Sequence, residues 1–113
     1  MQRDNAFLLD ILNAAEAAKK FSAKLTRKEF LENSLVQSAV LHQIIIVGEA
    51  VKRLSNAFRQ NHPQIPWKFI AGMRDRITHG YFEVDLEQVW NTLDKDLPEL
   101  IKYIKPLVSI KSE

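Results

Sequence analysis

The apolar residues of this chain recur mostly at steps of three and four, the spacing of one face of an α-helix. A first helix is expected over residues 5–22, with Asp4 as its N-cap. Its apolar stripe consists of Phe7, Leu8, Ile11, Leu12, Ala15 and Ala18. No stretch shows the period-two alternation of a half-buried strand, and the β-branched run at 44–47 lies inside a helical pattern. The pattern therefore predicts an all-α protein.

A second helical segment is expected after Thr26 and Glu29, which have the spacing of a capping box. It should extend over residues 31–60, a length of roughly 45 Å at 1.5 Å per residue. Its stripe follows alternating steps of three and four through Val36, Val40, Gln43 or Ile44, Val47, Val51, Leu54 and Phe58. A helix of this length needs apolar partners along most of its surface.

Prolines and a glycine delimit a short third helix. Pro63 and Pro66 should end the long helix, because proline lacks a backbone donor and disfavours helix in the residue before it. Pro66 then suits the first turn of a helix over residues 66–79. Gly80 is expected to close that helix.

A fourth helix is expected after Asp85, which can serve as its N-cap. Pro98 should kink or divide it. Its apolar positions are Leu86, Val89, Trp90, Leu93, Leu97, Leu100, Ile101, Ile104 and Leu107. The last residues, about 109–113, are expected to form a frayed tail.

Four amphipathic helices joined by short connections predict an antiparallel up-and-down four-helix bundle, since short loops make consecutive helices neighbours. At 113 residues, 46% of them apolar, the chain is expected to form one domain over 1–113 with a substantial core that includes Trp67 and Trp90. Excess apolar surface on the long second helix favours a symmetric homodimer.

Composition narrows the chemistry. The chain has no cysteine, which excludes disulfides and thiolate metal sites. His42, His62 and His79 do not have the spacing of metal ligands, and His42 is expected on a polar helix face. No run approaches the ~20 apolar residues of a membrane span, so a soluble, cytoplasmic protein is expected.

The net charge of +2 conceals an asymmetric distribution. Residues 50–80 carry six basic side chains against Asp75 alone, whereas residues 82–100 carry six acidic side chains against Lys95 alone. Such a chain can attract an anionic partner to one face. Ordinary solvated helix faces would give the same counts.

The most polar stretch is MRDRITHGYF, residues 73–82. Arg74 and His79 are about 140° apart around a regular helix, so they do not share one face. Gly80 lets the chain turn after His79, and Tyr81 can fold back toward the imidazole. An imidazole beside guanidinium groups can move a proton while arginine stabilises phosphate charge. The same residues can instead satisfy the carbonyls of a helix end, and the pattern leaves both interpretations open.

Gly48 and Glu49 lie in the middle of the long helical pattern. A glycine inside a helix costs about 1 kcal/mol relative to alanine. Gly48 can therefore mark a close approach of two helices, and Glu49 can pair with a buried arginine. A tolerated glycine followed by a solvated glutamate is the alternative.

Three blocks of the chain resemble, in the same order, the HepT-like proteins of the HEPN superfamily (higher eukaryotes and prokaryotes nucleotide-binding domains). The order Arg74, four residues, His79, one residue, Tyr81 is similar to the signature of that family, and the resemblance covers nearly the whole chain. The blocks are IIIVGEAVKRLS at 44–55, IPWKFIAGMRDRITHGYFEVD at 65–85 and VWNTLDKDLPEL at 89–100.

The resemblance implies an all-α homodimer with the motif residues of both subunits near a shared cleft. It implies a metal-independent RNA endonuclease without a cofactor, with tRNA as one candidate substrate. Such proteins act as the toxin of a type II toxin–antitoxin system and are neutralised by a minimal nucleotidyltransferase of the MNT type.

By position in the family signature, Arg74 and His79 would be the catalytic pair, and Asp75 and Arg76 would support them or bind RNA. Tyr81 would be the residue to which the antitoxin attaches AMP. The alternative is a non-catalytic subunit that holds nucleotide or substrate for its nucleotidyltransferase partner.

Overall fold

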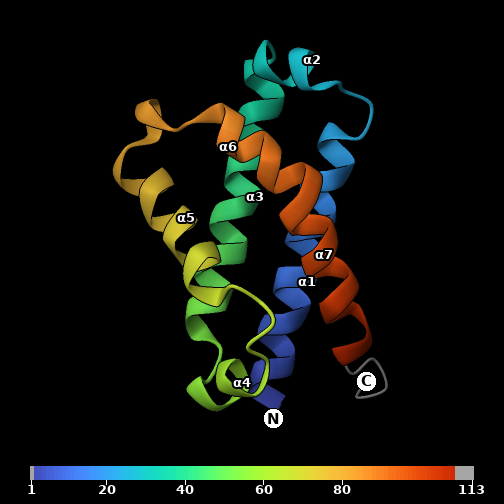
Figure 1. Cartoon of the computed structure of the whole chain (residues 1–113), viewed down its shortest axis with the longest axis vertical. Coiled ribbons are helices and arrows are strands. Elements are labelled where there is room, and N and C mark those ends of the chain that lie inside the picture. Colours follow the sequence, from blue (N-terminus) through green and yellow to red (C-terminus); the bar gives the residue numbers. More distant parts are fainter. Residues whose placement is uncertain (1, 109–113) are drawn as a thin grey trace.

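The computed structural model describes residues 2–108, and every regular element among them is helical. Helices α1 (Gln2–Ser22) and α3 (Ser34–Arg53) lie side by side and run in opposite directions (Figure 1). Helix α5 (Trp67–His79) packs on α3, and α7 (Leu97–Ile104) packs on α1. The all-α prediction is confirmed. The expected tail at 109–113 lies outside the described residues.

Shorter segments connect these helices. They are, in chain order, α2 (Arg27–Leu31), α4 (Asn56–Asn61), the 3-10 turn η1 (Tyr81–Glu83), α6 (Leu86–Asn91), the π-helical turn η2 (Thr92–Asp96) and the 3-10 turn η3 (Lys105–Leu107). The longer helices α1, α3 and α5 and the last segment, from α6 through α7, alternate in direction along the long axis of the molecule (Figure 1).

The core lies where the apolar stripes of the helices face one another. Its largest fully buried side chains are Ile11, Phe30, Val40, Ile44, Val47, Val51, Ile77, Val89, Leu93 and Ile104. Trp67 is buried as predicted, and the half-buried Trp90 packs on Phe30 with 5.6 Å between ring centroids. The periodicity of the sequence therefore identified the inward faces correctly.

The predicted start of the first helix is wrong. Helix α1 begins at Gln2, and Asp4 lies inside it as a buried side chain. The Asp4 carboxylate accepts hydrogen bonds from the backbone nitrogen of Ser55 at 2.9 Å and from its hydroxyl at 2.7 Å. Asp4 therefore bonds to a distant residue instead of capping its own helix, because a buried carboxylate needs hydrogen-bond partners.

The single helix predicted over residues 31–60 is also wrong. Helix α3 starts after Asn33, whose side chain caps it by accepting from the Val36 nitrogen. It ends at Arg53, and the hydroxyl of Ser55 then caps α4 by accepting from the Phe58 nitrogen. The apolar spacing continues across the break after Arg53, because Leu54 and Phe58 still face the core, so periodicity alone cannot reveal that break.

Local capping signals elsewhere were read correctly. The Thr26–Glu29 capping box is formed at α2, and the Asp85 side chain caps α6. Pro66 differs slightly from its predicted place, because it is the N-cap of α5 rather than a residue of its first turn. Gly80 ends α5 as predicted, with its nitrogen bonded to the Arg76 carbonyl.

The predicted division of the last helix is confirmed. The segment changes from α6 to the π-turn η2 and then to α7, in which Pro98 occupies the first turn. Within η2 the helix widens by one residue per turn, as the Leu97 nitrogen bonds to the Thr92 carbonyl. Proline clashes with the carbonyl four residues before it in a regular helix, and a wider turn relieves that clash.

Among the described residues, α3 is the one helix whose length and composition would suit a membrane span. From the sequence, no apolar run of that length is expected. In this fold α3 lies between α1 and α5, and its buried residues belong to the core. A central core helix has the same length and composition as a spanning one.

Candidate active site

The site is built where α5 crosses α3 at Gly48. A side chain on Gly48 would overlap the Cβ of Arg74, and its Cβ would lie 3.0 Å from the Arg74 Cγ. Only a glycine lets the two backbones come this close. The predicted close approach of helices at Gly48 is therefore confirmed, and the residue it admits is the arginine of the motif.

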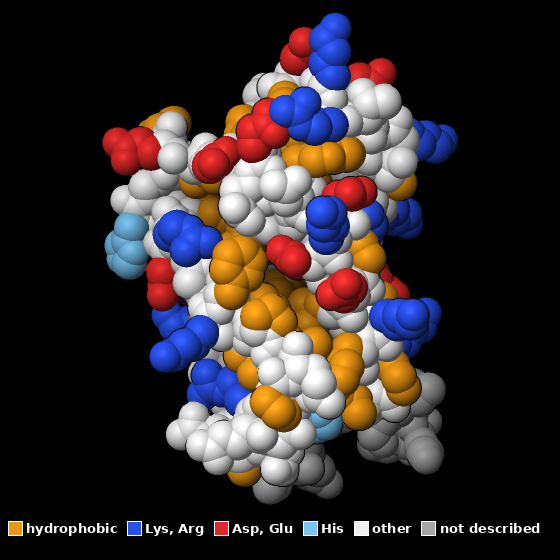
Figure 2. All heavy atoms as spheres, viewed as in Figure 1, with side chains coloured by type: hydrophobic (Ala, Val, Ile, Leu, Met, Phe, Trp, Pro, Cys, Tyr) orange, Lys and Arg blue, Asp and Glu red, His pale blue; other side chains and the backbone are white. Residues whose placement is uncertain are grey.

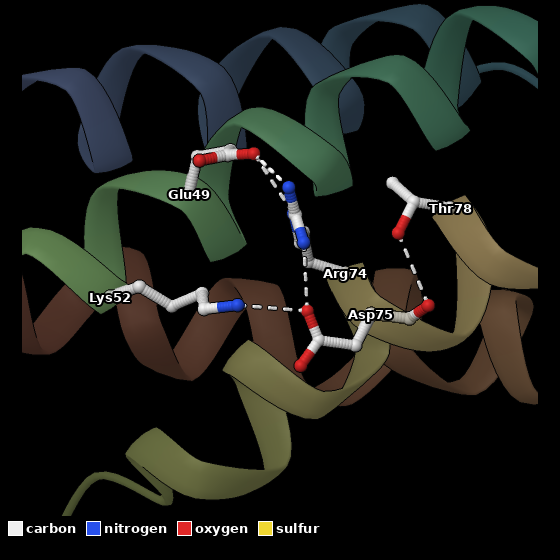
Figure 3. A network of polar contacts seen from close by, with 5 residues as sticks. All are labelled: Glu49, Lys52, Arg74, Asp75 and Thr78. Carbon is white, nitrogen blue, oxygen red and sulfur yellow. Dashed lines mark hydrogen bonds and ion pairs between the residues drawn. The ribbon is translucent and has the colours of Figure 1, made fainter.

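Arg74 is held by two carboxylates (Figure 3). Its Nε donates to Oε2 of Glu49 at 2.9 Å, and its Nη2 is bonded to the same oxygen. Its Nη1 donates to Oδ1 of Asp75 at 2.9 Å, and that oxygen also accepts from Nζ of Lys52 at 2.9 Å. The pairing of Glu49 with a partly buried arginine, one of the two interpretations of the sequence, is the correct one. Below, these four residues are called the arginine network.

Hydrogen bonds within the arginine network shift the pKa values of Asp75 and Arg74. The pKa of Asp75 is lowered by its hydrogen bond from Lys52 and, next, by that from Arg74. The pKa of Arg74 is raised by its hydrogen bonds to Asp75 and then to Glu49. Each group thus favours the charged form of its neighbour. The Arg74 side chain is 24% exposed, so the guanidinium is shielded on most sides and still reachable from solvent.

His79 lies in the last turn of α5 and is exposed. It borders a hollow between the end of α5, η1 and the start of α6, whereas Arg74 faces α3. Within residues 2–108 no hydrogen bond joins Arg74 to His79. The two residues lie on different sides of one helix, as their sequence spacing predicted.

Tyr81 follows the turn at Gly80 and contacts α3. Its hydroxyl donates to the hydroxyl of Ser38 at 3.3 Å, and its ring meets Phe82 edge to face with 5.6 Å between centroids. The predicted fold-back of Tyr81 toward the His79 imidazole is not among the contacts of the described residues. Tyr81 is nevertheless 43% exposed, and Phe82 is 98% exposed.

Arg76 is turned away from the arginine network. Its guanidinium lies over the ring of Phe69, 5.7 Å from the centroid, a favourable cation–π distance. It is exposed and makes no ion pair with any described carboxylate. The structure thus gathers Arg74 and Asp75 into one network and leaves Arg76, His79 and Tyr81 around its edge.

Two contact residues were missed by the sequence analysis. Lys52 is three positions after Glu49, so a helical reading places both on one face and could have found it. Ser38 carries no such signal, because its contact depends on where the chain turns after α5. The other histidines are elsewhere: His42 is exposed on α3, and Nδ1 of His62 is 2.7 Å from the Tyr103 hydroxyl. Among the residues the structure describes, no group of three metal-ligating side chains is clustered.

The chain is similar to known proteins of a single family. The family described as ribonuclease HepT-like matches residues 11–107. A protein of Thermococcus cleftensis named "Probable ribonuclease HepT" is 39% identical over 94 residues, which are 83% of this chain and 86% of that protein. A protein of Caldanaerobacter subterraneus named as a "Putative RNase" is 35% identical over 108 residues, or 96% of either chain. No solved structure gave a significant match. The chain belongs to the ribonuclease HepT-like family.

Proposed function

We propose that this protein is a metal-independent RNA endonuclease, in which Arg74 binds the scissile phosphate and His79 moves the proton. The observation that carries this proposal is the arginine network. Glu49 fixes the Arg74 guanidinium beside the helix contact at Gly48, so the positive charge is held in one orientation. Fixed donors stabilise the charge that develops on phosphate oxygens without reorganising during the reaction.

The reaction we propose uses the RNA itself as nucleophile. The 2′-hydroxyl oxygen attacks the adjacent phosphorus, and the bond from phosphorus to the 5′-oxygen breaks. One proton leaves the 2′-hydroxyl and one reaches the departing 5′-oxygen, which gives a 2′,3′-cyclic phosphate and a free 5′-hydroxyl. His79, exposed at the end of α5, can serve as base or as acid for these transfers.

We further propose that the working unit is a symmetric homodimer of antiparallel four-helix bundles. Arg74 and His79 lie on different sides of α5, so a second copy would bring another histidine and another arginine into one cleft. Exposed apolar side chains support a contact in this region: Leu35 is 78% exposed and Phe82 is 98% exposed. Ser38, about one turn after Leu35, contacts Tyr81, the residue before Phe82. Burial of such a patch stabilises an oligomer.

In the cell we propose a cytoplasmic toxin, one domain over 1–113, neutralised by an MNT-type nucleotidyltransferase that transfers AMP to Tyr81. Two features of Tyr81 support this assignment. The residue is 43% exposed, and it lies two positions after His79 in the sequence. An AMP group there would add negative charge and bulk at the place where RNA must approach.

The proposal is tested by incubating the purified protein with total tRNA in the presence of EDTA. We expect cleavage by the wild type, and none by Arg74→Ala or His79→Ala. Arg27→Ala is the control, because Arg27 is exposed and pairs with Glu87 away from α5. Failure of the wild type to cleave above the level of the two variants would rule out the nuclease.

One observation favours the second candidate, a non-catalytic subunit that holds nucleotide for a nucleotidyltransferase. All three nitrogens of the Arg74 guanidinium group are bonded to carboxylates, so a phosphate must compete for them. Binding of RNA without cleavage in the same assay, lost in Arg74→Ala, would establish this alternative.

A further inference from the structure

A hollow of about 370 Å³ lies between the end of α5, η1 and the start of α6. Its volume is within the range of roughly 300–1,000 Å³ typical of pockets for small ligands. It is separate from the arginine network and shares only the helix α5 with it. Its floor is formed by Met73, Ile77 and Val89, and its rim includes Arg76, His79 and Glu83.

The floor of the hollow is apolar and rigid. Met73, Ile77 and Val89 are all at least 96% buried. The sulfur of Met73 accepts a hydrogen bond from the buried Thr92 hydroxyl at 3.2 Å, which fixes the flexible methionine. These side chains close the bottom of the hollow with apolar atoms and offer no ligand to a metal ion or a free phosphate.

The rim carries charges of both signs. Figure 2 shows basic side chains along α5 and acidic side chains over η1 and α6 on this face of the molecule. Arg76 makes no ion pair within residues 2–108, and the Glu83 carboxylate has neither an ion pair nor a side-chain hydrogen bond there. One carboxylate oxygen of Asp85 is already engaged, because its Oδ1 accepts hydrogen bonds from the backbone nitrogens of Glu87 and Gln88. Glu83 is therefore an unpaired acidic side chain of the rim and Arg76 an unpaired basic one, and His79 and Gln88 lie beside them.

We propose that this hollow is a guanine-binding subsite, which rests on the proposed function because it holds one base of the RNA beside His79. Guanine offers two adjacent donors, N1–H and the N2 amino group, which one ionised carboxylate can accept together. It also offers O6 and N7, the acceptor pair that an arginine binds with two hydrogen bonds. Glu83 and Arg76 supply these complements.

The other bases fit this rim less well. An ionised carboxylate only accepts hydrogen bonds, so the N1 lone pair of adenine would face it unfavourably. Cytosine has one amino group and no N7 or O6, and uracil has a single N–H. In the free protein the Arg76 guanidinium lies over Phe69 and near Gly72, so it must turn toward the hollow to bind a base. Of the four bases, guanine alone offers groups that complement both Glu83 and Arg76.

Binding is tested by titrating isotope-labelled protein with GMP, AMP, CMP and UMP while amide resonances are followed by NMR. We expect GMP to shift the amides of Gly80, Glu83 and Val89 and to bind roughly tenfold more tightly than the others. Glu83→Gln should abolish this preference. Glu87→Gln is the matched control, since Glu87 is an exposed glutamate of α6 that pairs with Arg27 outside the hollow. Equal binding of all four nucleotides, or shifts confined to other residues, would overturn the subsite.

Cleavage provides the second arm. Short RNAs that differ in one base next to the cut should be cleaved fastest with guanine there, and the ratio should fall toward one in Glu83→Gln. A wild type that binds GMP in the hollow but cuts no RNA would contradict the nuclease and keep the subsite. A wild type that cuts RNA but gives no GMP shifts at the hollow would contradict the subsite and keep the nuclease.

Discussion

Gly48 of α3 lies directly against the Cβ of Arg74, so the position of the motif arginine depends on the absence of a side chain on another helix. The contact explains why a helix interior retains a residue that lowers helix stability by about 1 kcal/mol. The close approach also brings the Arg74 guanidinium to Glu49, the residue after Gly48.

We expect Gly48→Ala to destabilise the protein. Alanine gains about 1 kcal/mol of helix propensity, but overpacking costs typically about 1–3 kcal/mol where neighbours cannot move aside. The Arg74 Cβ is fixed to its own helix, so the overpacking term should prevail. Urea unfolding measures the difference. Gly72→Ala is the control, because its nearest neighbour would be Nη1 of Arg76 at 3.6 Å. Equal stability of the two variants would contradict the close approach.

Glu49→Gln should lower ribonuclease activity through Arg74. Glutamine keeps the shape but loses the charge that orients the guanidinium, and misplacing a catalytic group can reduce the rate roughly a hundredfold. The decrease should appear in kcat more than in KM, and thermal unfolding should confirm that the variant is folded. Glu16→Gln is a matched control, because Glu16 is 44% exposed beside Lys105 and Glu49 is 45% exposed. Equal activity of the two variants would mean that Arg74 needs no orienting carboxylate.

Asp75 should contribute stability that depends on pH. Its pKa in the folded protein is below the ordinary 3.8, because Lys52 and Arg74 bond to its charged form. Its contribution is therefore complete above that ordinary value and is lost as the pH falls through the lower, folded-state pKa. The melting temperatures of wild type and Asp75→Asn should differ most near neutral pH, and the difference should shrink as the pH falls below 3.8. Asp94→Asn, a change at an exposed aspartate, should show no such convergence; a constant gap for Asp75→Asn would contradict the assignment.

Tyr81→Phe should escape modification while keeping the ribonuclease intact. The change removes the only atom of Tyr81 that can carry AMP, together with one 3.3 Å hydrogen bond to Ser38. Incubation with the MNT-type partner and ATP, followed by mass spectrometry, should show one added AMP on the wild type and none on the variant. Tyr103→Phe should still be modified, since the Tyr103 hydroxyl is engaged with His62 and Gln64. AMP on Tyr81→Phe would place the modification elsewhere.

Helix geometry alone predicted part of the candidate site. The spacing of Arg74 and His79 indicated two sides of one helix, and Gly48 with Glu49 indicated a close contact with an arginine. Lys52 was missed although its spacing from Glu49 places both residues on one helix face, whereas the contact of Ser38 depends on where the chain turns after α5. The hollow beside His79 was missed for the same reason, since its floor and rim come from α5, η1 and α6 together.

By itself the sequence determined the features that arise within a few residues: apolar helix faces, the Thr26–Glu29 capping box, the Asp85 cap and the break around Pro63 and Pro66. These depend on backbone geometry and on hydrogen bonds between near neighbours. Only the tertiary structure decided where α3 ends and which way the motif side chains face. Asp4 bonds to Ser55, 51 positions away, and Arg74 is held by α3. A carboxylate or guanidinium that is removed from water bonds to the partner that packing brings to it, and the local sequence pattern does not identify that partner.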